Sequence, residues 1–264
     1  RLLHSKRHNR CFIQLEASNK RGNKISLDML PGKKGGTWLG MSKNEKIGVL
    51  TFYRESLKLK RERERGRGHL VADFLKSSQQ TTPLVFLENV RKTSCEYGGF
   101  NLILGHVPVG SSDMDFAYYC NREHKPLFDL KAGTYGLSNR YLNYGWEKVV
   151  IGKQSFNEIV QRQCTNDEKI TQLLTFLSDE TRYELNDTFR NPKDGDTPDE
   201  FLKGSSTGIS VNMPKYKFGT RTNSVIIVDS NDKVSFVERT MVEPINAENP
   251  VWKSTKFQFE LKDD

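Results

Sequence analysis

The sequence predicts an α+β fold with mainly antiparallel sheets. Apolar runs of strand length occur towards both ends of the chain, and the longest segments with helical periodicity are grouped between them, an order typical of α+β proteins. The chain has 264 residues, of which 35% are hydrophobic, so it can bury a core of domain size. We therefore expect a single domain over residues 1–264.

The strands are indicated by short apolar runs bounded by polar residues or glycine. Such runs lie at residues 47–53, 100–104, 114–119, 224–228 and 234–237. Residues 256–261 alternate between polar and apolar side chains, which predicts a further strand.

Four segments show helical periodicity. The first carries four apolar residues on one helical face: Leu70, Val71, Phe74 and Leu75. Thr82 and Pro83 are typical of the cap and first-turn proline of a second helix, and residues 144–160 form the third. Thr165 and Glu168 have the spacing of a capping box before the fourth.

The charge pattern argues against a nucleic-acid-binding protein, and the lengths of the apolar runs argue against a membrane-spanning one. The net charge is +8, but the 33 acidic residues are spread among the 41 basic ones, which favours a solvated basic surface. Residues 58–67 alternate in charge without aromatic residues for base stacking, so we expect no nucleic-acid partner. No apolar run approaches the ~18 residues of a spanning helix, and we expect no transmembrane segment.

Residues 186–208 are rich in Asp, Pro, Gly, Ser and Thr and lack a sustained apolar period. This composition predicts a long mobile surface loop. A role as a lid is an alternative, but a tolerated insertion is favoured because the segment carries no reactive chemistry.

The cysteine and histidine residues give no clear metal site. The four cysteines are far apart with no CxxC pair, which predicts neither a structural zinc site nor a disulfide framework and favours a reducing compartment. His4 and His8 would share a face of a helix, but they lie in a basic terminus that we expect to fray. Three further histidines are isolated and are interpreted as satisfied surface or core residues: His69, His106 and His124.

Three glycine-rich junctions predict a ligand cleft. They lie at residues 35–40, 133–139 and 219–224, where backbone without Cβ atoms lets a ligand approach closely. The third junction is interpreted as a polar turn that presents Arg221 and Thr222 at the mouth of the buried strand that follows.

Several motifs in order along the chain resemble those of the NRDE-type family that includes the Transport and Golgi organization protein 2 homologues. The resemblance covers nearly the whole sequence, and the order and spacing of the motifs make it specific. The motifs lie at residues 27–40, 66–71, 97–103, 121–122, 133–139, 152–154, 219–223 and 236–241.

The resemblance implies the fold of the N-terminal-nucleophile hydrolases, an αββα sandwich of two mainly antiparallel sheets. It also implies heme trafficking: reversible binding of heme as cargo, without a structural metal, and transfer from mitochondria or storage organelles. Heme-acceptor proteins or an organelle membrane surface would then be partners. The implied location is the cytoplasm, with mitochondria and the Golgi as further sites.

Heme binding needs an apolar slot for the macrocycle and cations for the propionates. Trp38 and Tyr135 are the candidate stacking residues, and Lys34 and Arg221 are the candidate propionate partners, with Thr222 beside Arg221. The alternative for both aromatic residues is an ordinary core position. No Cys-x-x-Cys-His motif for covalent heme occurs in the sequence.

Two other functions stay open from the resemblance. In related hydrolases a Cys thiol is the nucleophile, and the resemblance gives Asn139 the role of an oxyanion donor and Arg221 that of an orienting group. This sequence contains neither that Cys nor the Asn-Arg-Asp-Glu motif from which the family takes its name. We therefore expect a function without catalysis. Acyl-CoA or lipid handling is the second alternative.

Overall fold

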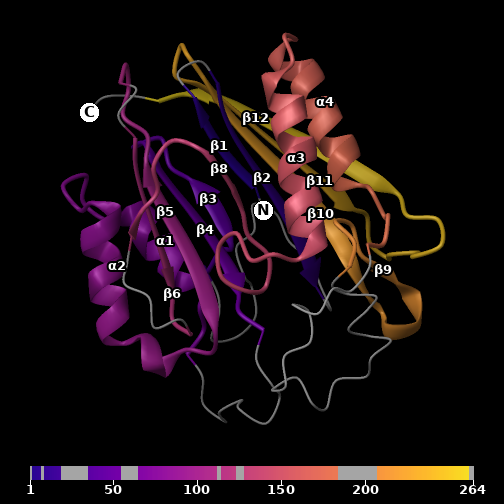
Figure 1. Ribbon diagram of the computed structural model, residues 1–264, viewed down its shortest axis with the longest axis horizontal. Helices are drawn as coiled ribbons and strands as arrows, with labels where there is room; N and C mark the ends of the chain where they lie inside the picture. Colours follow the sequence, from indigo (N-terminus) through magenta and orange to yellow (C-terminus); the bar gives the residue numbers. More distant parts are fainter. Residues whose placement is uncertain are drawn as a thin grey trace. The chain divides into compact units, whose positions relative to one another are not determined.

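The computed structural model describes residues 2–6, 9–18, 35–54, 65–111, 114–122, 128–183 and 207–261, with the backbone alone for the first two segments (Figure 1). The chain divides into two compact units, each built from separate segments. Unit 1 contains residues 1–22, 133–137 and 143–259, and unit 2 contains residues 23–132, 138–142 and 260–264. The expectation of a single domain stays a prediction.

A seven-stranded sheet forms the centre of unit 1. Its order is β12-β11-β10-β2-β1-β8, and β9 pairs separately with β10. Strand β1 pairs antiparallel with β2 and β8, and β10 pairs antiparallel with β2, β9 and β11. The strands are β1 Leu2–Lys6, β2 Asn9–Ser18, β8 Thr134–Gly136, β9 Asn212–Met213, β10 Phe218–Asp229, β11 Lys233–Met241 and β12 Trp252–Glu260.

Two helices pack on one face of this sheet, α3 Glu147–Gln161 and α4 Asn166–Leu177 (Figure 1). A short 3-10 helix, Pro214–Tyr216, precedes β10. Side chains at alternate positions of β10 and β11 meet the apolar stripes of the helices, because neighbouring residues of a strand point to opposite faces. The buried cluster consists of Phe156, Ile159, Ile170, Leu173, Leu177, Val225, Ile227 and Val237.

Unit 2 contains a five-stranded antiparallel sheet of order β3-β4-β5-β6-β7. Its strands are β3 Leu39–Met41, β4 Lys46–Phe52, β5 Phe100–His106, β6 Asp115–Cys120 and β7 Phe128–Asp129. Helices α1 His69–Lys76 and α2 Pro83–Lys92 cover one face, and the 3-10 helix Ser94–Glu96 follows them. Leu50, Phe74, Leu87, Phe100 and Leu102 are fully buried between these helices and the sheet.

The α+β class with two mainly antiparallel sheets is confirmed, and so are the predicted strands and helices. Thr82 caps α2 by accepting a hydrogen bond from the Val85 amide. Thr165 and Glu168 form the predicted capping box of α4. Helix α3 begins later than predicted, at Glu147, because Trp146 is its extended N-cap residue.

Two local predictions are wrong. Residues 219–223 are not a turn but part of β10, and the register with β2 shifts between Thr220 and Thr222, which makes Arg221 the extra residue of a β-bulge. His4 lies not in a frayed terminus or a helix but in β1, because β1 pairs with both β2 and β8. His8, His124, and residues 186–206 of the predicted loop lie outside the described residues.

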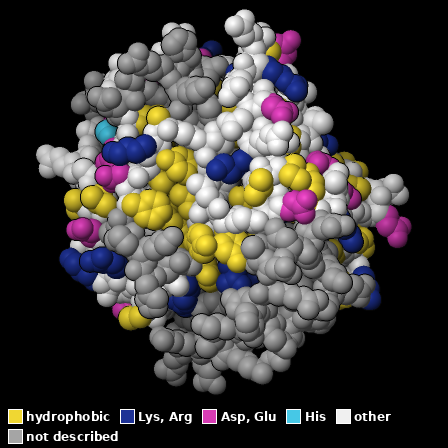
Figure 2. All heavy atoms as spheres, in the orientation of Figure 1, with side chains coloured by type: hydrophobic (Ala, Val, Ile, Leu, Met, Phe, Trp, Pro, Cys, Tyr) yellow, Lys and Arg dark blue, Asp and Glu magenta, His cyan; other side chains and the backbone are white. Residues whose placement is uncertain are grey.

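Charged side chains are dispersed over the surface that Figure 2 shows. Lys and Arg side chains stand among Asp, Glu and hydrophobic side chains and do not gather into one stripe. Within the described segments, no helix is both long and apolar enough to cross a bilayer.

Candidate functional site

Two glycine motifs that are distant in the sequence cross in unit 2. The Thr37 amide donates to the Gly68 carbonyl over 2.9 Å, and a Cβ atom placed on Gly36 would lie 2.9 Å from the Gly68 carbonyl carbon. Only glycine permits this approach, since real Cβ atoms keep farther from backbone carbons. The crossing joins the loop before β3 to the start of α1.

The crossing places Trp38 beside Arg67. The guanidinium carbon of Arg67 lies 6.0 Å from the centre of the Trp38 ring, a cation–π distance. One Nη atom of Arg67 also donates to the Gly99 carbonyl over 2.6 Å, which fixes the arginine in place. Both residues are partly exposed, and Trp38 packs against the core of unit 2. Trp38 and Arg67 thus form an aromatic–cationic pair at the surface of unit 2.

Asn139 lies along the same edge of β4 as Trp38. The Leu50 amide donates to the Trp38 carbonyl, and two residues farther along the strand the Asn139 amide group donates to the Phe52 carbonyl over 3.2 Å. The Arg54 amide donates to the Asn139 carbonyl. The structure therefore brings Trp38 and Asn139 to one strand edge, and it gives the Asn139 side chain a backbone partner.

A buried polar network holds the segment with Asn139 against the five-stranded sheet. The Asn101 amide donates to Thr51 Oγ1 and to the Arg140 carbonyl, over 2.9 Å in each case, and Tyr118 OH donates to Asn101 Oδ1 over 2.6 Å. Thr51 in turn donates to the Ser138 carbonyl. Asn101 is fully buried and satisfied from both ends of its amide. The network lies on the sheet face opposite α1 and α2, because residue 101 alternates with the core residues Phe100 and Leu102.

In unit 1, Arg221 and Thr222 lie at the bulge of β10. Arg221 forms an ion pair of 2.9 Å with Glu243, and its side chain is 12% exposed, against 48% for Glu243. The Thr222 and Thr240 hydroxyls lie 3.0 Å apart across β10 and β11. The cation of Arg221 is thus already neutralised by a carboxylate.

Tyr135 does not meet Arg221. It lies on β8 at the sheet edge, where it pairs with Leu3 of β1. Leu3 pairs in turn with Phe12 of β2, and Phe12 pairs with Ile226 of β10. Three strand spacings of about 4.8 Å and several residues along β10 therefore separate Tyr135 from the bulge. The two glycine junctions of unit 1 do not form one cleft within the sheet. Lys34 lies outside the described residues.

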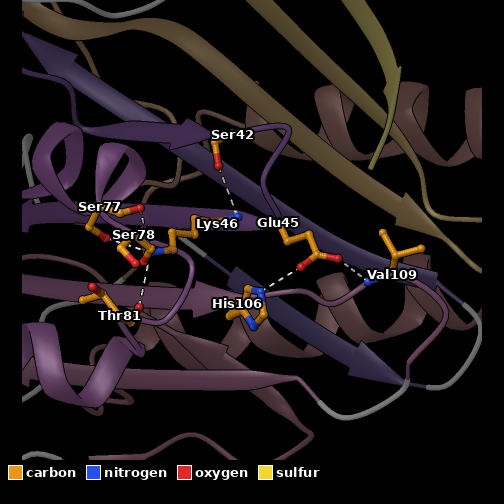
Figure 3. A network of polar contacts seen from close by, with 8 residues as sticks. All are labelled: Ser42, Glu45, Lys46, Ser77, Ser78, Thr81, His106 and Val109. Atoms are coloured by element: carbon orange, nitrogen blue, oxygen red, sulfur yellow. Dashed lines mark hydrogen bonds and ion pairs between the residues drawn. The ribbon is translucent and has the colours of Figure 1, made fainter. Parts of the chain in front are cut away.

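A second polar network lies at the start of β4 (Figure 3). The Lys46 ammonium donates to the Ser77 hydroxyl and to the carbonyls of Ser77, Ser78 and Thr81, at 2.6 to 3.2 Å. Lys46 is 1% exposed, and burial lowers its pKa from the ordinary value of 10.5. Because all four partners are neutral oxygens at the end of α1 and in the following turn, Lys46 is a structural anchor for that turn.

Directly before Lys46 in the chain, Glu45 accepts hydrogen bonds from the His106 ring, over 2.8 Å, and from the Val109 amide (Figure 3). Burial, followed by the charge of Asp129, raises the pKa of Asp115, which lies opposite His106 in the sheet. His106 is therefore a satisfied structural residue, as its isolation in the sequence indicates. Among the described residues no group of three His, Cys, Asp or Glu side chains could hold a metal ion.

Sequence reasoning missed Arg67 and Asn101 as site residues. Both lie in motifs that carried the family resemblance, residues 66–71 and 97–103, so a signal was present. What the sequence does not contain is the crossing that brings Arg67 to Trp38, since 29 positions separate them in the numbering. The three cysteines whose side chains are described are free thiols: Cys95, Cys120 and Cys164.

Comparisons with known proteins agree on one family. The family model Transport and Golgi organisation 2 matches residues 9–243. The chain is 37% identical over 242 residues to a mouse Transport and Golgi organization 2 homolog, covering 89% of this chain and 82% of that protein. It is 37% identical over 241 residues to the human homolog, with the same coverage. The Drosophila melanogaster Transport and Golgi organization protein 2 is 28% identical over 225 residues, covering 81% of this chain and 75% of that protein.

Proposed function

The chain belongs to the Transport and Golgi organisation 2 family, and we propose that it is a heme-trafficking protein that binds heme reversibly at the Trp38–Arg67 pair. The names of its relatives contain the terms transport and Golgi organization. The specific transport that we propose is the movement of heme from mitochondria or storage organelles to acceptors. Heme-acceptor proteins or an organelle membrane surface would be its partners.

The geometry of the Trp38–Arg67 pair carries the proposal. A flat macrocycle with two carboxylates needs an aromatic surface next to a cation, and Arg67 lies 6.0 Å from the Trp38 ring. Both side chains are partly exposed, so a ligand can reach them without unfolding of the core. The crossing at Gly36 and Gly68 adds backbone without Cβ atoms beside the pair. Among the predicted ligand residues, Trp38 is therefore the best supported.

The other predicted ligand residues are less suited to this role. The Asn139 amide is engaged with Phe52, and Arg221 with Glu243. An oxyanion role of Asn139 in a hydrolase would require loss of its bond to the Phe52 carbonyl. Arg221, Thr222 and Tyr135 remain proposals for a heme contact elsewhere on the chain.

An absorbance titration of heme into the full chain tests the proposal. We expect a saturable one-to-one Soret shift, and Trp38→Ala and Arg67→Ala should each weaken the affinity by about tenfold, the effect of one lost aromatic or charge-assisted contact. Trp252→Ala is the matched control, because Trp252 is also partly exposed and also lies against an arginine, Arg239, at 5.0 Å. If all three variants, confirmed as folded by circular dichroism, bind like the wild type, the Trp38–Arg67 pair is not the heme site.

Acyl-CoA binding is the second candidate, and the start of α1 favours it. The N-cap residue Gly68 makes no side-chain cap bond, and no acidic residue lies in the first turn, so the amides beside Arg67 suit phosphate groups. CoA carries more charge than the heme propionates, so its affinity should fall more steeply between low and high salt. A steep salt dependence of CoA binding together with no Soret shift would replace the heme proposal with this one.

A further inference from the structure

A polar cluster in unit 1 lies where the end of α4 meets β10, β11 and the first residue of β12. It consists of Ser178, Asn223, Arg239 and Trp252. Asn223 and Arg239 are direct cross-strand partners, so their side chains leave the same face of the sheet. This cluster is separate from the Trp38–Arg67 pair, which belongs to unit 2.

The hydrogen bonds of Ser178 fix the orientation of the Asn223 amide. Ser178 Oγ donates its single proton to the Leu174 carbonyl over 2.9 Å, so towards other groups it can only accept. The Asn223 atom 3.3 Å away must then be Nδ2, which donates. Its other amide atom, Oδ1, is buried and has no hydrogen-bond partner, and Asn223 as a whole is 0% exposed. A buried carbonyl oxygen without a hydrogen-bond donor is rare in native proteins, so we expect a donor from a bound molecule at this position.

Arg239 supplies the complementary chemistry. One Nη atom donates to Ser178 Oγ over 3.3 Å, and the guanidinium lies 5.0 Å from the centre of the Trp252 ring. In the part of the chain that the structure describes, no carboxylate lies within ion-pair distance of Arg239, whereas Arg221 has Glu243 at 2.9 Å. The C-terminal end of α4 contributes only about half a negative charge. The guanidinium therefore remains partly uncompensated, with further N–H donors for an anion.

We propose that this cluster binds inorganic phosphate, a tetrahedral oxyanion that keeps a proton near neutral pH. The phosphate oxygens accept from Arg239, and the P–OH group donates to Asn223 Oδ1, which the anion reaches when the surrounding side chains shift, because Asn223 is 0% exposed in this structure. A carboxylate or a sulfate satisfies the arginine but has no proton for the asparagine. Asn223 thus selects the protonated oxyanion, and Arg239 supplies the charge-assisted hydrogen bonds.

Calorimetric titration of the full chain with sodium phosphate and, in parallel, sodium sulfate at pH 7 and equal ionic strength tests the proposal. We expect saturable binding of phosphate and at least about tenfold weaker binding of sulfate, the effect of leaving one buried acceptor unpaired. Asn223→Ala should reduce phosphate to the level of sulfate, and Arg239→Gln should weaken both anions by about tenfold or more. Arg221→Gln is the matched control, because that arginine is already paired, and it should leave both affinities unchanged.

Intrinsic fluorescence of the wild-type chain gives a second measurement that does not depend on a variant folding correctly. Trp252 is one of three tryptophans, so phosphate should change the intrinsic fluorescence of the wild type, and Trp252→Phe should abolish that change. No saturable phosphate binding to the wild-type chain overturns the proposal. Equal affinity for phosphate and sulfate also overturns it, since Asn223 Oδ1 would then play no part in selecting the anion.

Discussion

At the residue scale, the buried Lys46 shows how one cation organises a turn. Its ammonium bonds to three carbonyls and one hydroxyl between Ser77 and Thr81, and no counter-charge is among these partners. Burial of a charge is costly unless hydrogen bonds replace the lost water, and these four bonds do so. The turn between α1 and α2 is thereby tied to the first residue of β4.

Replacement of this lysine should destabilise the protein strongly. Lys46→Met keeps most of the length of the side chain but leaves the carbonyls of the turn without their donor, so we expect a loss of about 2 kcal/mol or more in the free energy of unfolding. Urea denaturation followed by circular dichroism measures it. Lys43→Met is the control, because Lys43 is exposed and should change the free energy little. A midpoint for Lys46→Met equal to that of the control contradicts the anchoring role.

Glu168 gives a pH-dependent prediction. Hydrogen bonds from the backbone and side chain of Thr165 lower the pKa of Glu168 below its ordinary 4.5. A carboxyl with a lowered folded-state pKa stabilises the protein above pH 4.5, and this contribution is lost as the pH falls below that value. The melting temperature of Glu168→Gln should therefore be lower than that of the wild type at pH 7, and the difference should shrink towards zero at strongly acid pH. Glu88→Gln, on an exposed face of α2, should show no such convergence.

At the scale of elements, the crossing of Gly36 and Gly68 is a junction where backbone packs directly against backbone. Gly36→Ala would place a Cβ atom 2.9 Å from a backbone carbon, which cannot move as a side chain can. We expect a loss of about 1–3 kcal/mol in the free energy of unfolding, together with weaker heme binding, because Trp38 lies only two residues further along the chain. Gly145→Ala is the control, since an added Cβ there would have no atom within 4 Å and the φ of Gly145 is not positive. Equal unfolding midpoints for the two variants would refute the constraint.

The elements that the sequence predicts are those specified by local patterns. The capping box of α4 and the proline cap of α2 need only residues within one turn of a helix. Strands β1 and β2 escape prediction because their pairing with β8 and β10 joins the start of the chain to positions more than a hundred residues later. Residues 219–223 resemble a turn because glycine and threonine are common in both turns and bulges, and only the register with β2 separates the two.

The candidate site is predictable in part for the same reason. Trp38 stands out in the sequence because it lies in a glycine-rich junction, which is a local property. Its partner Arg67 and the buried Asn101 become visible only when strands and loops distant in sequence are brought together. The pairing of Arg221 with Glu243, which weakens its case as a ligand residue, likewise depends on a contact across 22 positions.

At the scale of the whole molecule, the path of the chain links the two units. Residues 133–137 supply β8 at the edge of the seven-stranded sheet in unit 1, and the next five residues bond to Thr51, Asn101 and Tyr118 in unit 2. Unit 1 also needs residues from before and after most of unit 2 to complete its sheet. Neither unit is therefore a continuous segment that can form without the rest of the chain.

We expect the protein to unfold in a single cooperative transition as a result. When one unit opens, the short segment that joins it to the other is released as well, and the hydrogen bonds of that segment are lost. Lys46→Met in unit 2 and Thr165→Ala in unit 1, the latter losing about 1 kcal/mol with its cap, should each lower one common midpoint. Far-ultraviolet circular dichroism and tryptophan fluorescence should give coincident urea curves for both variants. Two separate transitions, each shifted by only one of the substitutions, would instead mean that the units unfold independently and that the shared chain path does not couple their stability.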